Sequence, residues 1–272
     1  DRTTAGGGPG PALYTDLYEL TMLQVYFEER MHDQAVFSLF VRRLAERRNH
    51  LLACGLDTAL CYLEQLEFGD SELGELADTG QFSERFLRWL GDFRFTGEVE
   101  AVPEGTPVFA EEPLLEVVAP LPQAQLAETI VMNQVHLQTT IASKVARLVQ
   151  AADGRPVVDF SARRLHGVDA GLGAVRAGHV AGLSATSNIL GGRIHGVPLS
   201  GTMAHSYIQA HDDELDAFRA FARVHGETVL LVDTYDTLEG TRKVVQLARE
   251  MGEAFRVRAI RLDSGDLLEL SR

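Results

Sequence analysis

The feature that most constrains the fold of this chain is a series of four short apolar runs that each end in polar or charged side chains. Such runs predict buried strands, and stretches with helical patterns separate them. Alternating strands and helices imply a parallel sheet with right-handed crossovers, and ligands bind where the carboxyl ends of such strands meet. The sequence therefore predicts one shared polar site from the residues that follow the runs: Asp159, Phe160, Arg163, Arg164, Thr202, His205, Ser206, Asp233, Asp236, Arg261, Asp263 and Asp266.

The alternating region begins near residue 155. Its strands are expected over residues 156–160, 197–200, 228–233 and 256–262, and its helices over 169–181, 187–194, 213–225 and 239–251. Closing a barrel takes about eight parallel strands. We therefore expect an incomplete α/β barrel that is truncated at residue 272.

The first half of the chain has a different pattern. Turn residues at 103–105 and 111–113 separate three short apolar runs between residues 98 and 119, which predicts antiparallel strands. A further strand is expected over 35–43, with helices over 14–29, 56–68 and 83–93. A long apolar stripe predicts one helix over 123–152, which ends before Gly154.

These patterns predict the α/β class and four segments. Residues 1–12 form a disordered glycine-rich tail, because they hold too few apolar side chains to build a core. Residues 13–122 form an N-terminal α+β domain with antiparallel strands, and residues 123–154 form a connecting helix. Residues 155–272 form the first half of an α/β barrel catalytic domain.

Charge and composition limit the function classes. The formal net charge of −14 over 272 residues argues against a general nucleic-acid binder, although a local site can still attract a small anion. No apolar run is long enough to span a membrane, and no signal peptide is recognisable. Cys54 and Cys61 lie about 10 Å apart on an expected helix, too far for a disulfide. We expect a cytoplasmic protein with no nucleic-acid or membrane partner, two cysteines that are small core residues, and no metal site built from Cys and His.

Eight short motifs are distributed in order along the chain. They are T-D-L-Y-E-L-T-M (15–22), F-R-F-T-G-E-V (93–99), P-E-G-T-P-V-F (103–109), D-F-S-A-R-R-L-H-G (159–167), A-T-S-N (185–188), G-T-M-A-H-S (201–206), V-D-T-Y-D-T (232–237) and R-L-D-S-G-D (261–266). In this order and combination the chain resembles the nicotinate phosphoribosyltransferase family. The resemblance implies cytoplasmic homodimers that join nicotinate to phosphoribosyl pyrophosphate in NAD salvage, with nicotinate mononucleotide and pyrophosphate as products and ATP hydrolysis coupled. It also implies an irregular α/β barrel beside an N-terminal α+β domain.

The residue types at the strand ends suit this chemistry, in which a ribosyl cation develops as pyrophosphate leaves. Guanidinium groups suit anion binding, and the candidates are Arg163, Arg164 and Arg261. Asp263 and Asp266 suit ribose hydroxyls or a Mg²⁺ ion bound through the substrate pyrophosphate. Phe160 suits stacking on a pyridine ring.

Further roles come from the resemblance alone. It implies that Tyr18 reaches the other face of the ring from the second subunit, with Asp16 nearby. It also implies that ATP phosphorylates His205 and that Asp233 orients this imidazole. Considered without the flanking residues, His205 is equally consistent with a histidine that is hydrogen-bonded at a strand end.

Three positions bear on the choice of substrate. The family usually has glycine where this chain has Ser161 and Ala185, so a Cβ there is expected to narrow the ring pocket or shift the backbone. The nicotinamide-specific relative has an acidic side chain where this chain has Ser187. A hydroxyl can donate to the carboxylate of nicotinate, whereas an acid would repel it, so nicotinate is expected. The alternatives are a nicotinamide-specific phosphoribosyltransferase and a non-catalytic barrel fragment that binds nucleotide or a partner.

Overall fold

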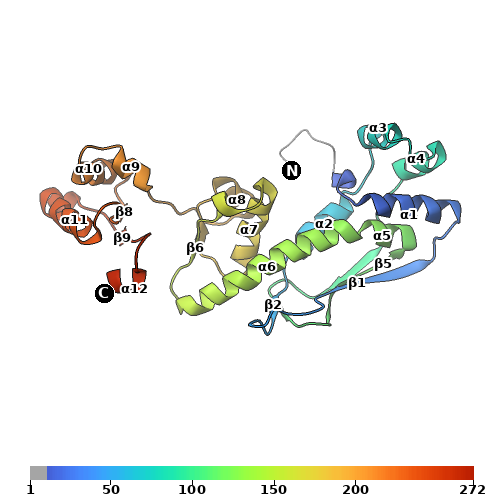
Figure 1. The fold of residues 1–272 in the computed structure, drawn as a ribbon, viewed down its shortest axis with the longest axis horizontal. Coiled ribbons are helices and arrows are strands. Elements are labelled where there is room, and N and C mark those ends of the chain that lie inside the picture. Colours follow the sequence, from blue (N-terminus) through green and yellow to red (C-terminus); the bar gives the residue numbers. More distant parts are fainter. Residues whose placement is uncertain (1–10) are drawn as a thin grey trace. The chain divides into compact units, whose positions relative to one another are not determined.

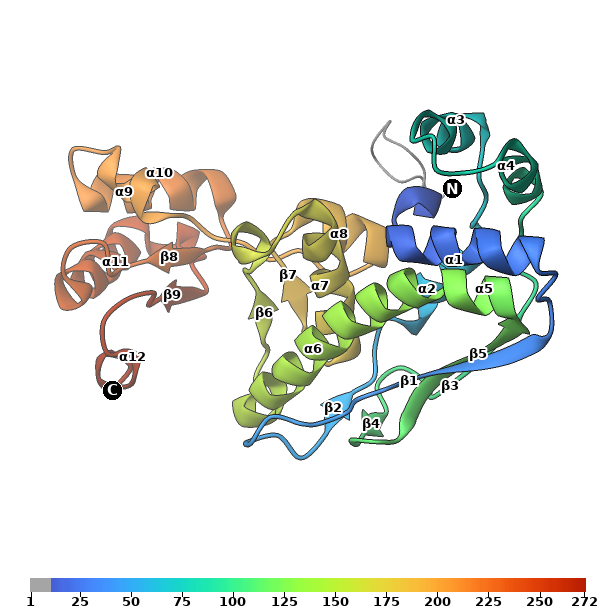
Figure 2. The same ribbon diagram turned by 45° about the vertical axis from the view of Figure 1, so that its right-hand side comes forward.

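The computed structural model describes residues 11–272 of the chain. The chain packs as two units, unit 1 (Asp1–Leu199) and unit 2 (Ser200–Arg272), and each is described by itself. Antiparallel strands occur in the first half of unit 1, and both units contain a pair of parallel strands, as the two sequence patterns predict (Figures 1 and 2).

Unit 1 contains most of the helices and strands of the described chain. In order they are η1 (Pro11–Leu13), α1 (Leu17–Glu28), β1 (Gln34–Phe40), β2 (Leu51–Leu52), α2 (Leu56–Glu64), α3 (Asp70–Asp78), α4 (Glu84–Gly91), β3 (Glu98–Ala101), β4 (Pro107–Val108), β5 (Pro113–Pro120), α5 (Leu121–Leu126), α6 (Glu128–Ala152), β6 (Val158–Asp159), η2 (Ala162–Arg164), α7 (Val168–Val180), β7 (Ala185–Thr186) and α8 (Ile189–His195). Residues 1–10 of the expected tail lie outside the described residues. Ala12, which was expected in that tail, is instead buried in the main core.

Three strands of unit 1 form an antiparallel sheet in the order β1–β5–β3. Exposure alternates along β1 from one residue to the next, as expected for a strand with one inward face. The central strand β5 pairs Val118 with Val36 of β1 and Val117 with Val99 of β3. β4 pairs with β2 instead, so the predicted antiparallel strands are confirmed but are divided between two sheets.

Aromatic side chains from α1 and α4 pack against the main core of unit 1. Ser83 caps α4 by accepting a hydrogen bond from the backbone nitrogen of Phe86, which is fully buried. The ring of Phe27 lies 5.2 Å from that of Trp89, and Phe93 meets Trp89 edge-on at 5.9 Å. The only tryptophan of the chain therefore reports on the core of unit 1.

The long helix expected over residues 123–152 is two helices. α5 ends at Leu126 and α6 begins at Glu128, and the backbone of Ala127 between them stays in the right-handed region (φ −70°, ψ −19°). α6 packs against α2, β2 and α7 (Figure 2). Because α7 packs along α6, residues 155–199 belong to the same unit as the residues before them. None of the helices in the described part of the chain is long and apolar enough to cross a membrane.

Cys54 does not lie on the expected helix, because α2 begins only at Leu56. Gly55 occupies its N-cap position with a φ of 103°, and an added Cβ there would lie 2.5 Å from the carbonyl oxygen of Gln134 on α6. Glycine therefore permits both the left-handed backbone and the close approach of α6. Burial and the neighbouring Glu104 carboxylate raise the pKa of the Cys54 thiol to about 12, so it is a small core residue as predicted.

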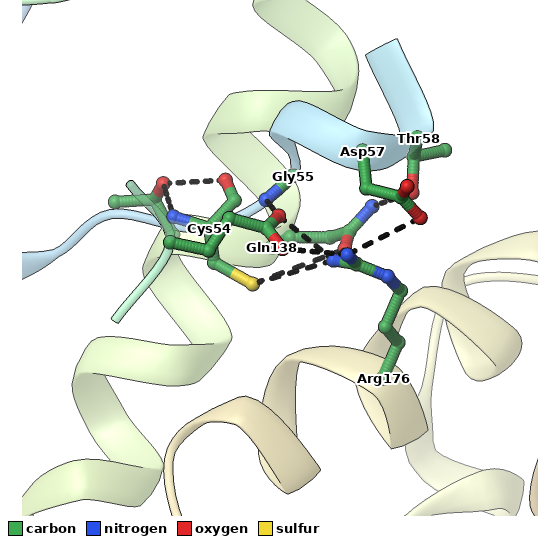
Figure 3. Close-up of polar contacts among 8 residues, drawn as sticks. Cys54, Gly55, Asp57, Thr58, Gln138 and Arg176 are labelled. Atoms are coloured by element: carbon green, nitrogen blue, oxygen red, sulfur yellow. Dashed lines mark hydrogen bonds and ion pairs between the residues drawn. The ribbon is translucent and has the colours of Figure 1, made fainter. Parts of the chain in front are cut away.

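A largely buried ion-pair network joins α7 to the N-terminal elements of unit 1 (Figure 3). Arg176 on α7 donates to both carboxylate oxygens of Glu104, at 2.8 Å and 2.5 Å, and to Gln138 Oε1 at 3.1 Å. It also pairs with Asp57 at 3.3 Å, and Glu104 accepts from the backbone nitrogen of Gly55 at 2.6 Å. Burial alone would raise the pKa of the Glu104 carboxyl, but these partners hold it below its usual range.

The parallel pair of unit 1 is shorter than expected. β6 and β7 pair Val158 with Ala185 and Asp159 with Thr186. Residues 197–200 were expected to form a full strand, but they contribute only one parallel bridge, between Leu199 and Thr186. Pro198 explains the difference, because it has no N–H to donate to a strand ladder.

Unit 2 contains α9 (His205–Gln209), α10 (Glu214–His225), β8 (Val229–Leu231), α11 (Thr237–Met251), η3 (Gly252–Ala254), β9 (Ala259–Arg261) and α12 (Leu267–Leu270). β8 and β9 are parallel, with Leu231 opposite Arg261. The side chain of Asp236, expected at the polar site, caps α11 by accepting from the backbone nitrogen of Glu239. α11 packs closely on β8 at Gly240, where an added Cβ would lie 2.2 Å from the carbonyl oxygen of Val232.

Candidate active site

A histidine, a carboxylate and a hydroxyl meet past the ends of β8 and β9 in unit 2. His205 is the first residue of α9, and its side chain is 36% exposed. Its Nδ1 lies 3.1 Å from Thr234 Oγ1, and its Nε2 lies 3.5 Å from Asp263 Oδ2. A carboxylate only accepts hydrogen bonds, so Asp263 favours a proton on Nε2 and leaves Nδ1 to accept from the Thr234 hydroxyl.

Arg261 and Asp263 form an ion pair at the same edge. Arg261 is the last residue of β9, and its Nη2 donates to Asp263 Oδ1 while its Nη1 donates to the carbonyl oxygen of Met203. The side chain of Asp263 is 41% exposed. It is therefore held between a guanidinium and an imidazole and is still accessible to a ligand.

Asp233 lies just past β8, but its contacts differ from the expected ones. Its Oδ2 accepts from the backbone nitrogens of Asp263 and Ser264, at 2.5 Å and 2.7 Å, and from Ser264 Oγ at 2.9 Å. Burial alone would raise the pKa of the Asp233 carboxyl, but these donors hold it below its usual range. In this structure Thr234 and Asp263, rather than Asp233, contact the ring of His205, which corrects the expected partner of the histidine.

Two further residues expected at the substrate have structural contacts. Thr202 Oγ1 donates to the carbonyl oxygen of Val229 at 2.7 Å. This contact is beside the first residue of β8, about 13 Å along the strand from Asp233. Asp266 Oδ1 accepts from the backbone nitrogens of Leu268 and Glu269, both at 3.0 Å, and so caps α12. Substrate binding by Thr202 and Asp266 stays a prediction.

A second polar group lies at the ends of β6 and β7 in unit 1. The buried carboxylate of Asp159 accepts from Thr186 Oγ1 at 2.7 Å and from the backbone nitrogen of Ser161 at 2.8 Å. The backbone nitrogen of Ser187 donates to the carbonyl oxygen of Asp159 at 2.8 Å. These bonds fix the adjacent segments that carry Phe160 and Ser187, the residues expected to contact the pyridine ring.

The expected anion-binding residues of unit 1 are exposed. Arg163 and Arg164 lie on η2, and within residues 11–272 neither guanidinium forms an ion pair. The backbone of Ser161 before them is in the ordinary right-handed region (φ −88°, ψ −11°). The serine that replaces glycine here therefore fits the backbone without strain. Ala185, the other departure, is buried within β7.

Tyr18 and Asp16 belong to a third polar group, between α1 and α6. The hydroxyl of Tyr18 donates to Glu128 Oε1 at 3.0 Å, and Asp16 Oδ2 accepts from Thr129 Oγ1 at 3.3 Å. Glu19 is fully buried and accepts from the backbone nitrogen and the hydroxyl of Thr129, at 3.1 Å and 2.9 Å. Partial burial and the bond to Glu128 raise the pKa of Tyr18 to about 12, so its hydroxyl stays protonated at neutral pH.

Sequence reasoning missed four polar residues that hold these groups together: Glu19, Thr186, Thr234 and Ser264. Each lies inside a motif and next to a predicted residue, so position within the motif was the available signal. In the part of the chain that the structure describes, no cluster of three or more His, Cys, Asp or Glu side chains could hold a metal ion.

Comparisons with known proteins agree with the motifs. Residues 13–136 match the family model described as the nicotinate phosphoribosyltransferase (NAPRTase) N-terminal domain. The nicotinate phosphoribosyltransferase pncB2 of Mycobacterium tuberculosis is 54% identical over 261 residues, which cover 96% of this chain and 56% of the relative. The Bacillus subtilis nicotinate phosphoribosyltransferase is 41% identical over 263 residues, which cover 96% of this chain and 54% of the relative.

Among solved structures, human nicotinic acid phosphoribosyltransferase matches with a TM-score of 0.86 at 29% identity, over 94% of this chain and 62% of that one. The chain spans just over half the length of the curated relatives that it matches. By its motifs, its relatives and its fold, the chain belongs to the nicotinate phosphoribosyltransferase family.

Proposed function

We propose that this protein transfers the phosphoribosyl group of phosphoribosyl pyrophosphate to nicotinate, giving nicotinate mononucleotide and pyrophosphate in NAD salvage. The observation that carries the proposal is the group of His205, Arg261 and Asp263 past the ends of β8 and β9. It occurs in a chain that is 54% identical to a nicotinate phosphoribosyltransferase. The architecture that we propose for the catalytic domain is an irregular α/β barrel.

The transfer requires that the substrates are positioned and that the charge developing on them is stabilised, rather than that a proton is transferred. The lone pair of the pyridine nitrogen forms a bond to C1 of the ribose, and pyrophosphate leaves with the electrons of the broken C1–O bond. The ring nitrogen of nicotinate is unprotonated at neutral pH, so no base is needed. We assign the phosphate groups to the exposed guanidiniums of Arg163 and Arg164. Phe160 stacks on the ring, and the hydroxyl of Ser187 donates to the carboxylate of nicotinate.

Mg²⁺ fits this site as an ion held mainly by the substrate. Residues 11–272 hold no metal cage of their own, and the half-exposed carboxylate of Asp263 suits an ion that takes most of its ligands from pyrophosphate and water. Mg²⁺ bound there would neutralise charge on the leaving pyrophosphate. Arg261 keeps Asp263 oriented, and Asp266 is the second carboxylate that we assign to this region.

We assign the acceptance of a phosphoryl group from ATP to His205. A ring nitrogen attacks the γ-phosphorus, the bond to the β-phosphate oxygen breaks, and ADP leaves. With a proton on Nε2, attack by Nδ1 puts a positive charge on the ring that the Asp263 carboxylate stabilises. Water later cleaves the phosphohistidine, which couples ATP hydrolysis to the transfer.

The proposal includes a cytoplasmic homodimer in which Tyr18, with Asp16 nearby, completes the site of the neighbouring subunit. Its support is that the side chain of Tyr18 is exposed on α1 and anchored by Glu128 of α6. A tyrosine fixed in this way presents a rigid ring to a partner at little cost in side-chain entropy.

The function is tested with the full-length protein, phosphoribosyl pyrophosphate, ATP and Mg²⁺, by comparing turnover of nicotinate, nicotinamide and quinolinate at equal concentration. We expect nicotinate to react fastest, and His205→Ala to abolish the acid-labile, base-stable label from γ-³²P-ATP. His32→Ala, which replaces an exposed histidine of unit 1, is the matched control and should keep the label. Faster turnover of nicotinamide would support the nicotinamide-specific alternative. Nucleotide binding without turnover of any base would support a non-catalytic fragment.

A further inference from the structure

One carboxylate oxygen determines the path of the loop after β9. Oδ2 of Asp233 accepts from two consecutive backbone N–H groups, those of Asp263 and Ser264, and also from the hydroxyl of Ser264. Asp233 is 9% exposed, so water competes little for these bonds. An acceptor that holds two consecutive backbone N–H groups fixes the direction of the chain rather than the position of one side chain.

The loop fixed in this way carries Asp263, a residue of the proposed site. Asp263 is the second residue after β9, and its carboxylate lies between Arg261 and His205. Holding the backbone nitrogens of residues 263 and 264 fixes the direction in which the side chain of Asp263 leaves the backbone. Geometry at Asp263 therefore depends on a residue that is 30 positions earlier in the sequence.

The contacts of His205 leave no ring nitrogen for Asp233. Nδ1 lies beside the hydroxyl of Thr234, and Nε2 lies beside the carboxylate of Asp263. The second oxygen of Asp233, Oδ1, is buried and has no hydrogen-bond partner among the described residues. The carboxylate is thus bound through one oxygen, and that oxygen faces the loop.

We infer that Asp233 is a positioning residue that clamps the loop at 263–264 and so aims Asp263 at the ribosyl donor, without acting through His205. The inference rests on the proposed function and adds to it the residue that sets the geometry of ribosyl binding. It predicts that loss of Asp233 affects the loop first and the donor affinity as a consequence. Any effect of Asp233 on the imidazole of His205 passes through Asp263.

The first test is hydrogen exchange measured by mass spectrometry on the full-length protein, which needs no turnover. Removal of the carboxylate in Asp233→Ala is expected to speed exchange of the amides of Asp263 and Ser264 by about tenfold or more. Ser264→Ala, which removes one of the three bonds, should give a smaller change. Thr234→Val removes the ring contact but not the clamp, so these two amides should exchange at the wild-type rate.

Exchange in α11 serves as the internal reference, because an unchanged rate there shows that unit 2 is still folded. Wild-type exchange at residues 263 and 264 in Asp233→Ala would overturn the inference. If Asp233→Ala does not fold, Asp233→Asn replaces it, since the amide keeps an acceptor oxygen but loses the charge.

The second test separates the loop from the ring by a double-mutant cycle. Calorimetry measures the affinity for phosphoribosyl pyrophosphate with Mg²⁺ in the wild type, Asp233→Asn, His205→Asn and the double variant. If Asp233 acts through the loop, Asp233→Asn should weaken binding by about tenfold in both backgrounds. If Asp233→Asn weakens binding in the wild type but not in the His205→Asn background, Asp233 acts through the imidazole of His205 and the inference is overturned.

The two tests also distinguish failure of the inference from failure of the proposed function. A wild-type protein that binds no phosphoribosyl pyrophosphate would refute the function, and with it the assignment of Asp263 to the donor. Weaker donor binding without faster loop exchange would instead refute the clamp and leave the proposed function standing.

Discussion

Replacing Arg176 by methionine is expected to destabilise unit 1 by about 3–5 kcal/mol, the usual cost of removing one partner of a buried ion pair. The side chains of Arg176 and Glu104 are only 15% and 17% exposed, so solvent screens this pair weakly. Methionine keeps much of the length of the side chain, so the loss comes from charge rather than from volume. Glu104 keeps its bond from the backbone nitrogen of Gly55, but its charge stays buried without a guanidinium.

Two comparisons sharpen this prediction. The double variant Arg176→Met with Glu104→Gln should lose less stability than Arg176→Met alone, because it leaves no unpaired buried charge. The folded-state pKa of Glu104 lies below the unfolded value of 4.5. The stabilisation from this group is therefore present above pH 4.5 and lost as the pH falls through the folded pKa. In Arg176→Met, this decrease in stability at acid pH should be absent.

Urea unfolding followed by the fluorescence of Trp89 measures the effect, since this only tryptophan packs against the core of unit 1. With a slope of roughly 1–3 kcal/mol per molar urea, the midpoint should fall by about 1 M or more. Arg88→Ala is the control, because it breaks an exposed pair with Glu84 in the same unit that is worth less than about 1 kcal/mol. A shift for Arg176→Met as small as that of the control would refute the reasoning.

Three further predictions concern the polar groups described above. Burial raises the pKa of Glu19, so the stability of the wild type should fall as the pH rises above 4.5. Urea titrations at several pH values should show a weaker pH dependence of stability for Glu19→Gln, and an equal dependence in both proteins would contradict the raised pKa. Ser187→Asp should raise the KM for nicotinate by about tenfold or more, and steady-state kinetics with an equal effect on nicotinamide would disprove the proposed contact. Mixed Tyr18→Ala and His205→Ala subunits should regain part of the activity, because one hybrid site has both residues; no recovery after subunit exchange seen by native mass spectrometry would argue against a shared site.

Local patterns predicted most of the fold, and the exceptions have local causes. The antiparallel strands and the helices α7, α10 and α11 follow from apolar periodicity, turn residues and acidic caps. The strand expected over 197–200 fails at Pro198, which cannot donate to a ladder. α3 (Asp70–Asp78) was not predicted, because Leu76 is its only buried residue and Gly74 lies at its centre.

The sequence predicted that His205, Arg261 and Asp263 gather at one edge, but it did not predict how the side chains there pair. β8 and β9 are in register, with Leu231 opposite Arg261, so Asp233 and Asp263 each follow their strand by the same number of residues. Spacing along the sequence therefore cannot decide which of the two carboxylates contacts His205. That choice depends on the path of the loop after β9, which bonds between segments 30 and 31 residues apart determine.

The close packing of α11 on β8 affects how sequence variants of this chain should be classified. Even an alanine at position 240 would place a methyl group against the carbonyl oxygen of Val232, and the peptide group that must move is the one that joins Val232 to Asp233. Gly240 lies on α11, outside the group of residues assigned to the proposed site. We nevertheless expect a loss-of-function allele at this position to have the phenotype of an allele in the loop at 263–264, so Gly240 should be ranked with the positions of the proposed site.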